Sequence, residues 1–334
     1  MDEREARRLV AEAGRMFRKE GLVARTWGNM SCRIDESTFA ITPSGLGYES
    51  MTEDDVVLFH MADGTWSGTR KPSSEKGVHI AAYRQFPDVG FVAHTHQPFA
   101  SALGLAGFDA LSLAEEEHVA LGGVACAHYG LPGSKRITAN VSAALSTGAH
   151  AVLMAQHGAL IAGKDLNDAF SRAKLLEAVC RRACKGQPGG SVLGEEGLNT
   201  LAKQLAGSFP CIGYTGAPAV QEAAKAEKPF FAQLDDMAQM IGPELLCVRM
   251  EPRAVLAALK KHSAVLVYDK NGGAGALCRA DSTGDCEALK LLVEKACVGF
   301  LHTRALGVSA KLSALHAMLM HMVYKTKYAK QIGG

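Results

Sequence analysis

The sequence of 334 residues lacks the features that mark membrane, nucleic-acid-binding and disulfide-rich proteins. No apolar run approaches the roughly 20 residues that a helix needs to span a bilayer. Basic and acidic residues nearly balance, at 36 and 34, so no overall field attracts nucleic acid or an anionic membrane. The nine cysteines are odd in number, scattered and without a C-x-x-C pair, which favours reduced thiols over a disulfide framework.

The N-terminal segment is also unlike a secretory signal. Residues 1–22 are rich in charge, and Ala6, Val10, Ala13 and Phe17 recur at helical spacing. Together these observations predict a cytoplasmic protein whose partners include neither nucleic acid nor a membrane.

The order of the predicted elements indicates an α/β protein in two parts. In the first part, short β-prone runs alternate with periodic helices. A stretch rich in Gly, Pro and Ala follows from Gly186 to Lys228, and one predicted helix over 196–206 interrupts it. We therefore expect a first domain at 1–208, a linker at 209–228 and a smaller α/β domain at 229–334.

The second part echoes the first. The segment AVLMAQHGALIAGKDLNDAF, residues 151–170, aligns with AVLVYDKNGGAGALCRADSTGDCEAL, which begins at Ala264. Two strand–turn–helix segments can match by chance, but we favour a duplication whose second copy has degenerated. Where the first copy has His157, the second has Lys270 or Asn271, so we expect the second copy to be non-catalytic.

Two histidines stand one residue apart in the segment FVAHTHQPFA, residues 91–100. The apolar run before them predicts a strand, and alternate residues of a strand project to the same side, so the rings of His94 and His96 can converge on one point. This spacing supplies half of a metal site. The alternative is that both are ordinary histidines satisfied by hydrogen bonds, so the pair needs support from elsewhere in the chain.

Zinc sites in enzymes use three protein ligands and leave one coordination position open. His157 in the segment QHGALI is the candidate for the third ligand, because it ends a predicted strand and a glycine follows it. His150 is a weaker candidate, since it stands at the start of that strand. His118 and His128 fall in a loop-like segment that could cap the site.

A carboxylate and several turns precede the histidine pair. Glu75 in KPSSEKGVH stands at the start of a predicted helix, whose positive end would keep the carboxylate ionised. The alternative is that Glu75 only stabilises the helix, through a favourable interaction of its carboxylate with the positive end of the helix dipole. The adjacent Ser73 and Ser74, with the turns GNMS and TPSG upstream, offer hydroxyls and backbone N–H groups to an anion. Together they predict a phosphate cradle beside a metal.

The motifs GNMS, TPSG, PSSE, HTH and QHG occur in an order and spacing that resembles the class II aldolase/adducin family, and in particular its L-fuculose-1-phosphate aldolase branch. The resemblance covers approximately residues 5–208. It implies a three-layer α/β/α fold around a central, mostly antiparallel sheet, with the second, smaller α/β domain beyond it.

The same resemblance implies the chemistry. One divalent transition metal per chain, usually zinc, would be held by His94, His96 and His157 and would stabilise an enediolate, while Glu75 serves as the catalytic acid and base. The substrate would be a small phosphorylated sugar or a related hydroxy-keto compound, cleaved at a carbon–carbon bond. The residues carried over to the phosphate site are Asn29, Ser44, Gly45, Ser73 and Ser74.

One departure from the family pattern concerns a catalytic tyrosine. The aldolases place it in the loop after the HTH strand, where this chain reads LSLAEEEHVALGG, residues 111–123. Either this acidic run is a solvated surface, or Glu116 or Glu117 replaces the tyrosine as proton donor. The alternatives to an aldolase are therefore an epimerase, decarboxylase or dehydratase that uses the same metal site, and a non-catalytic, adducin-like interaction module.

The resemblance also bears on assembly. Members of the family commonly form rings of four, with each active site at a subunit boundary. A fused second copy would stand in for one neighbour, so we expect a homo-oligomer, either a dimer of two-lobed chains or a tetramer. Only the N-terminal lobes would then be catalytic, because residues 209–334 contain no His-x-His.

Overall fold

The computed structural model of the chain describes residues 1–107, 111–189 and 195–328. It divides into two compact units between Ala183 and Cys184, well before the boundary near residue 208 that the composition predicted. None of the helices in the described ranges is both long enough and apolar enough to cross a membrane.

The first unit is built on an eight-stranded sheet with the order β4-β3-β2-β1-β5-β8-β7-β6. Strands β6 and β7 run parallel, and the other neighbouring pairs of this sheet are antiparallel. Strand β5 therefore lies in the middle, between β1 and β8. The strands are β1 (Asn29–Arg33), β2 (Thr38–Ile41), β3 (Val57–His60), β4 (Trp66–Ser67), β5 (Phe91–Thr95), β6 (Val124–Ala127), β7 (Ala151–Met154) and β8 (Gly158–Gly163).

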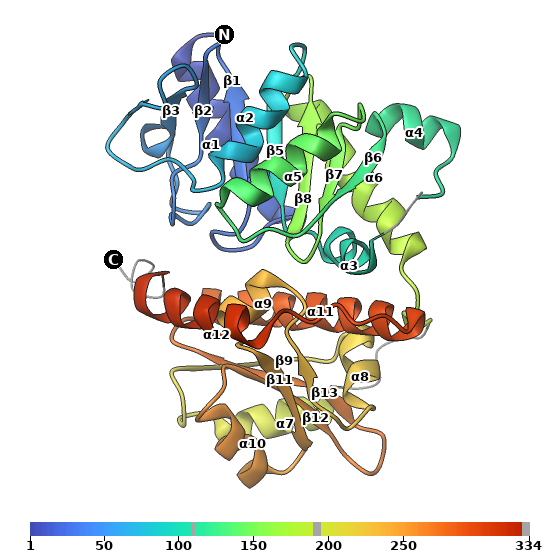
Figure 1. The fold of residues 1–334 in the computed structure, drawn as a ribbon. Helices are drawn as coiled ribbons and strands as arrows, with labels where there is room; N and C mark the ends of the chain where they lie inside the picture. The colour runs from blue at the N-terminus through green and yellow to red at the C-terminus, as the bar shows by residue number, and fades with distance from the viewer. Residues whose placement is uncertain (108–110, 190–194, 329–334) are drawn as a thin grey trace. The chain divides into compact units, whose positions relative to one another are not determined.

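Helices cover both faces of this sheet, which confirms the expected three layers (Figure 1). Helices α2 and α5 pack on one face, where their apolar side chains form a buried cluster with Phe39, Val92 and Leu160. Helices α1, α3 and α6 pack on the other face, and Phe17 of α1 meets Phe170 of α6 edge-on. The helices are α1 (Glu3–Lys19), α2 (Lys76–Gln85), α3 (Pro98–Ala106), α4 (Glu115–Leu121), α5 (Lys135–Leu145) and α6 (Leu166–Ala183).

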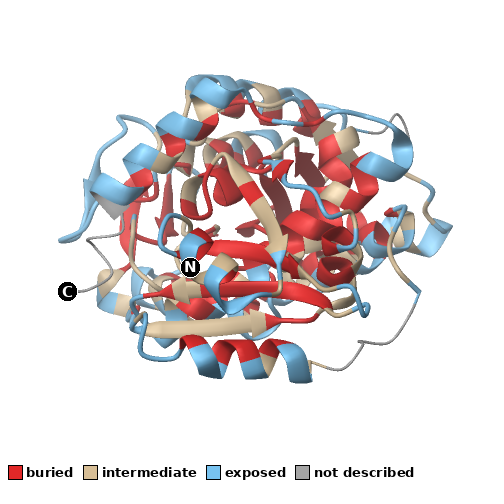
Figure 2. Cartoon of the chain, turned by 90° about the horizontal axis from the view of Figure 1, so that it is seen from below, coloured by how far each residue is buried: buried red, intermediate tan, exposed pale blue. Residues whose placement is uncertain are grey.

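Local sequence explains where several of these helices begin. The side chain of Asp2 accepts a hydrogen bond from the backbone of Glu5 at the start of α1, and Ser134 caps α5 in the same way. Pro98 opens α3 at a position where its missing N–H costs nothing. The buried residues, red in Figure 2, follow the inward faces of the helices and the strands between them.

The second unit contains a five-stranded sheet with the order β10-β11-β12-β13-β9, in which β11 and β12 are the parallel pair. Helices α7 and α10 pack on one face, and α8 and α11 on the other. The strands are β9 (Cys211–Thr215), β10 (Phe230–Phe231), β11 (Glu244–Arg249), β12 (Ala264–Tyr268) and β13 (Ala274–Ala280). The helices are α7 (Glu196–Leu205), α8 (Pro218–Ala224), α9 (Asp235–Met240), α10 (Pro252–Leu259), α11 (Thr283–Leu306) and α12 (Ala314–Val323).

Residues 209–228 do not form the predicted linker, because they contain strand β9 and helix α8. Pro218 is the first residue of α8, a position that tolerates proline. Gly213 lets β9 pack closely on α11, since a Cβ there would lie 2.8 Å from the sulfur of Cys286. Proline and glycine start a helix and permit close packing here, so their frequency misled the prediction.

The second sheet repeats part of the first. The strand order β5-β8-β7-β6 corresponds to β9-β13-β12-β11, with the parallel pair in the same place. Helix α2 precedes β5 as α7 precedes β9, and α6 follows β8 as α11 follows β13. This topology supports the hypothesis of a degenerate repeat, which would begin at α7 and lack counterparts of α1 and β1 to β4.

Candidate metal centre

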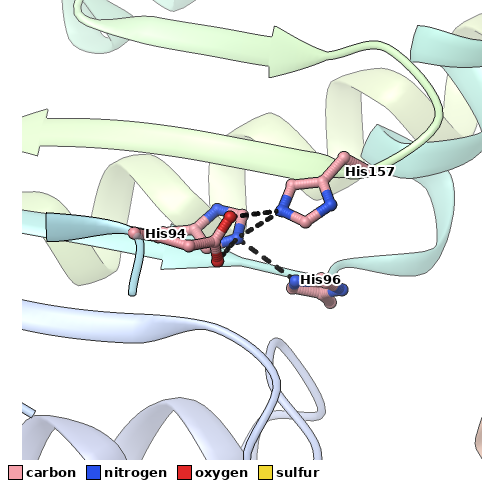
Figure 3. A group of neighbouring side chains, drawn as sticks. His94, His96 and His157 are labelled. Atoms are coloured by element: carbon pink, nitrogen blue, oxygen red, sulfur yellow. Dashed lines mark hydrogen bonds and ion pairs between the residues drawn. The ribbon is translucent and has the colours of Figure 1, made fainter. Parts of the chain in front are cut away.

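Three histidines and one glutamate converge in the first unit. His94, His96, His157 and Glu75 are all buried, and their ligand atoms lie within 4.8 Å of one another. The Nε2 atom of His94 lies 3.2 Å from that of His96 and 3.1 Å from that of His157. Figure 3 shows the three rings turned toward one another. The trio predicted from the sequence is therefore brought to one point, at separations that bonds of about 2 Å to one zinc ion allow.

The three histidines come from strands in the middle of the sheet and from the segments that adjoin them. His94 lies within β5, His96 follows the end of that strand, and His157 lies in the short turn between β7 and β8. That turn contains Gln156 in the left-handed region, with φ of 60°. A Cβ on Gly158 would collide with the carbonyl oxygen of Thr95, so glycine is what lets β8 pair with β5 directly beside the site.

A backbone carbonyl group determines the role of one nitrogen of His94. The Nδ1 atom of His94 lies 2.9 Å from the carbonyl oxygen of Ala159, so Nδ1 carries the proton and donates it there. The Nε2 atom of His94 is therefore the nitrogen that faces the other two imidazoles and is available to a metal. A hydrogen bond of this kind on the far nitrogen is typical of histidines that bind a metal.

Glu75 completes the cluster from the residue preceding helix α2. Its Oε1 lies 3.0 Å from Nε2 of His157 and its Oε2 lies 3.2 Å from Nε2 of His94. Burial raises the pKa of this carboxyl, but the nearby imidazoles of His157 and His94 outweigh that effect and hold the pKa well below its usual range. The side chain is therefore ionised.

The donor set fits a zinc-like ion. Nitrogen ligands about 2.0–2.1 Å from a tetrahedral metal stand roughly 3.3 Å apart, close to the separations of the imidazole nitrogens here. His94, His96 and His157 are the residues that would hold such an ion, and Glu75 is near enough to serve as a further ligand.

Four of the five predicted phosphate-binding residues lie on two turns that join each other beside Glu75, and the fifth, Asn29, begins strand β1. The turns meet at a bridge between Pro43 and Pro72, and the backbone N–H of Ser44 donates to the carbonyl of Lys71. That N–H is already used, but the side chains of Ser44 and Ser74 are exposed and can contact an anion. Of the other predicted members, Gly45 adjoins Ser44 with a positive φ, and Ser73 and Asn29 are buried.

The two acidic candidates in α4 are not in the cluster. Helix α4 lies beyond β6, at the edge of the sheet, whereas the cluster lies on β5 and the turn before β8 (Figure 1). Glu117 accepts hydrogen bonds from the backbone of Ala114 and from Arg182, and these interactions lower its pKa. Glu116 is exposed on the same short helix. Glu117 therefore has a structural role at the start of α4.

The other histidines considered as ligands lie elsewhere. The ring of His150 stacks on Phe86, with the centroids 4.1 Å apart, and its Nδ1 donates to the carbonyl oxygens of Gly122 and Gly148. His118 belongs to α4, and His128 is exposed in the loop after β6. None of these three joins the group of metal-ligand side chains found among the described residues.

The sequence analysis missed a buried histidine behind Glu75. His79 is inaccessible to solvent and contacts Asn29 and Ser31. Burial lowers its pKa to about 3, so the ring is neutral. A signal was available in the sequence, because His79 stands four residues after Glu75, on the same face of the helix.

Comparison with known proteins gives a consistent result. The model of the class II aldolase and adducin N-terminal domain matches residues 8–184, up to the boundary between the two units. An L-fuculose 1-phosphate aldolase of known structure is 27% identical, covers 60% of this chain and 96% of its own, and gives a TM-score of 0.51.

Two other solved structures show a weaker similarity. The L-fuculose-1-phosphate aldolase from Thermus thermophilus is 24% identical over 52% of this chain and 90% of its own, with a TM-score of 0.46. YgbL from Escherichia coli, a candidate aldolase, epimerase or decarboxylase, is 24% identical over 54% of this chain and 88% of its own, with a TM-score of 0.49.

Proposed function

The chain belongs to the class II aldolase and adducin family, and from that premise we propose that it is a metal-dependent lyase. Its substrate would be a small phosphorylated sugar or a related hydroxy-keto compound, cleaved at a carbon–carbon bond. The observation that carries this proposal is the buried cluster of His94, His96, His157 and Glu75. A non-catalytic interaction module would have no need to keep four such side chains together.

Each residue has a chemical task in this proposal. A divalent metal held by the three histidines, zinc by family resemblance, supplies Lewis-acid polarisation of a carbonyl and a neighbouring hydroxyl. Glu75 takes the hydroxyl proton on a carboxylate oxygen and returns it to the product, which an ionised and buried carboxylate is suited to do. The surrounding burial keeps bulk water away from the proton in transit.

The turns beside Glu75 support a phosphorylated substrate. The hydroxyls of Ser44 and Ser74 are exposed next to the first turn of α2, whose positive end favours an anion. This arrangement would hold the phosphate at one end of the substrate while the reacting carbons lie at the histidines. The proposal thus assigns binding to the turns and chemistry to the cluster.

A second candidate function is an epimerase or decarboxylase on the same metal site. The observation that favours it is the position of Glu116 and Glu117, since the structure places neither in the cluster as a substitute for the aldolase tyrosine. An aldol cleavage needs a proton donor for the leaving fragment, and Glu75 is the one acidic side chain in the cluster found among the described residues.

A substrate panel tests the proposal. The zinc-loaded protein would be incubated with ketose phosphates and aldonate phosphates, and the products analysed for dihydroxyacetone phosphate, aldehyde and carbon dioxide. Cleavage to a triose phosphate and an aldehyde is expected. An isomerised substrate or carbon dioxide would instead establish the second candidate, and no change in any compound would refute both.

A further inference from the structure

A chain of buried hydrogen bonds joins strand β1 to helix α2 behind the metal centre. Asn29 and Ser31 project from the same face of β1, because they are two residues apart. Glu75, His79 and Tyr83 follow one another at four-residue intervals along one face of α2 and the residue that precedes it. The two sets of side chains interleave.

Four hydrogen bonds link these side chains in order. The Tyr83 hydroxyl lies 2.8 Å from Ser31 Oγ, and Ser31 Oγ lies 2.7 Å from Nδ1 of His79. Nε2 of His79 lies 2.5 Å from Oδ1 of Asn29, and Nδ2 of Asn29 lies 3.2 Å from Oε2 of Glu75. Every member is buried, so water cannot replace a missing partner.

The direction of every bond follows from the Asn29 amide. Its Nδ2 donates to Glu75 and its Oδ1 faces His79, and an amide oxygen can only accept a hydrogen bond. That oxygen in turn requires a proton on Nε2 of His79. The Nδ1 atom of a neutral His79 is then an acceptor and takes the hydroxyl proton of Ser31, whose oxygen is left to accept from Tyr83.

We propose that His79 is a positioning residue for Glu75. By fixing the Asn29 amide, it holds one oxygen of the Glu75 carboxylate and so sets the orientation of the carboxylate toward the three histidines. Hydrogen bonds that all run the same way polarise one another, which strengthens the last bond, the one to Glu75. The catalytic part of this inference rests on the proposed function, whereas the direction of the bonds does not.

The Ser31 hydroxyl keeps the hydrogen bonds running in this direction, and its removal should release the orientation of Glu75. Without the serine hydroxyl, Nδ1 of His79 loses its donor, and the ring can move its proton from Nε2 to Nδ1. The Asn29 amide can then rotate and turn its oxygen toward the carboxylate of Glu75, which repels it. Glu75 would keep its place at the start of α2 and lose its fixed orientation.

Nitrogen NMR of the histidine rings tests the direction without any substrate. In the protein with ¹⁵N-labelled histidine, the signals that disappear in His79→Gln belong to His79. We expect a protonated Nε2 and a bare Nδ1 in the wild type, and a mixture of the two tautomers in Ser31→Ala. A protonated Nδ1 in the wild type, or an unchanged tautomer in Ser31→Ala, would overturn the inference.

Kinetics test the positioning role. Ser31→Ala should lower kcat about tenfold, the effect of one hydrogen bond, while KM and bound zinc stay within about twofold. Ser31→Thr, which restores the hydroxyl, should recover most of the rate, and Tyr83→Phe should cost less than Ser31→Ala because it is one bond further from Glu75. Should the added methyl group of threonine prevent folding, Tyr83→Phe alone still tests the order of effects.

Ser101→Ala is the matched control. Ser101 is a fully buried serine of α3 whose hydroxyl has no hydrogen-bond partner in the described structure. Its replacement removes the same atom and no interaction, so kcat should not change. An equal fall in both serine variants, or a Ser31→Ala effect on KM alone, would refute the positioning role. If the wild type turns over no substrate, the proposed function fails while the NMR result still decides the hydrogen-bond chain.

Discussion

At the scale of single residues, Glu75 differs in kind from the histidines around it. The three imidazoles direct their Nε2 atoms toward a common centre, where a metal would occupy those lone pairs. Glu75 has two oxygens and needs only one to contact a metal. It is therefore the member of the cluster with the capacity to exchange a proton with a substrate.

Replacing Glu75 separates metal binding from proton transfer. Glu75→Gln keeps the shape of the side chain and removes the group that accepts the proton, so turnover should fall by roughly 10²–10⁴ while zinc content stays near that of the wild type. Steady-state kinetics and elemental analysis of the same samples measure both. Glu116→Gln, on the exposed surface of α4, is the control and should keep its activity. A Glu75→Gln enzyme with normal turnover would show that another group handles the proton.

Gly158 should be sensitive to the addition of a single methyl group. Gly158→Ala puts a Cβ against the Thr95 carbonyl, which must force β8 away from β5. Overpacking of this kind costs about 1–3 kcal/mol of unfolding free energy, and zinc affinity should fall with it because His157 adjoins the displaced strand. Denaturant unfolding and zinc competition would measure the two effects. Gly47→Ala is the control, since a Cβ there meets nothing within 4 Å, and equal stability of both variants would contradict the expectation.

At the scale of secondary structure, the sequence predicted the elements that carry the site. The apolar run before His94 forms strand β5, and the segment after Ser74 forms helix α2, because alternation and a positive helix end are local properties. His94, His96, His157 and Glu75 could be predicted for the same reason, each having a local motif around it. The second sheet was harder, since proline and glycine in residues 209–228 are compatible both with a linker and with a helix start packed against a strand.

The hydrogen-bond chain behind Glu75 shows what local motifs cannot supply. Ser31 and His79 are far apart in sequence, and their contact depends on the pairing of β1 with β5 and on the packing of α2 over them. A neutral buried histidine also resembles any other apolar-face histidine in the sequence. Its place four residues after Glu75 is a local signal, but the three-dimensional arrangement is needed to identify its partners, Ser31 and Asn29.

Helix α11 offers a test of buried charge. Burial raises the pKa of Glu294 above its ordinary value of 4.5, although Thr215 donates a hydrogen bond to it. Since the folded protein binds this proton more tightly than the unfolded chain, Glu294 lowers stability progressively as the pH rises above 4.5, until it passes the raised pKa. Glu294→Gln keeps an acceptor for Thr215 and should therefore raise the melting temperature at neutral pH.

The pH dependence distinguishes this explanation from a general effect of glutamine. The gain from Glu294→Gln should disappear in acid, below the ordinary value of 4.5, where the carboxyl is protonated in both states. Melting curves at several pH values would show this. Glu196→Gln, on the exposed side of α7, should leave the melting temperature unchanged at every pH. A gain from Glu294→Gln that persisted in acid would refute the role of the raised pKa.

At the scale of the whole molecule, the second unit keeps the framework of the first without its ligands. At one constant offset, Glu75 corresponds to Glu195 and Pro98 to Pro218, each at the same place before or within a helix. At that offset His94 and His96 correspond to Tyr214 and Gly216. The carboxylate of Glu195 accepts a hydrogen bond from the backbone of Gly216. We propose that a duplication followed by loss of the metal site gave rise to these correspondences.

The number of metal ions bound per chain tests whether the second unit has lost its metal site. We expect one zinc per chain in the purified protein, because the described residues contain a single group of metal-ligand side chains. A double variant, His94→Ala with His96→Ala, should bind none, while His316→Ala in the second unit should keep one. Elemental analysis combined with light scattering measures metal and chain count together. Two zinc ions per wild-type chain would contradict the loss of the second site.

The different surroundings of β5 and β9 have a consequence for hydrogen exchange. Strand β5 has a partner on each side, whereas in the described structure β9 pairs with β13 alone. An amide that faces a neighbouring strand exchanges with deuterium only when the sheet opens, and an amide that faces outward from an edge can exchange without any opening. The two strands have similar sequence patterns and, on our hypothesis, descend from one ancestor. Their amides would nevertheless exchange at different rates. In β5 nearly every amide would exchange slowly, and in β9 slow and fast amides would alternate along the strand.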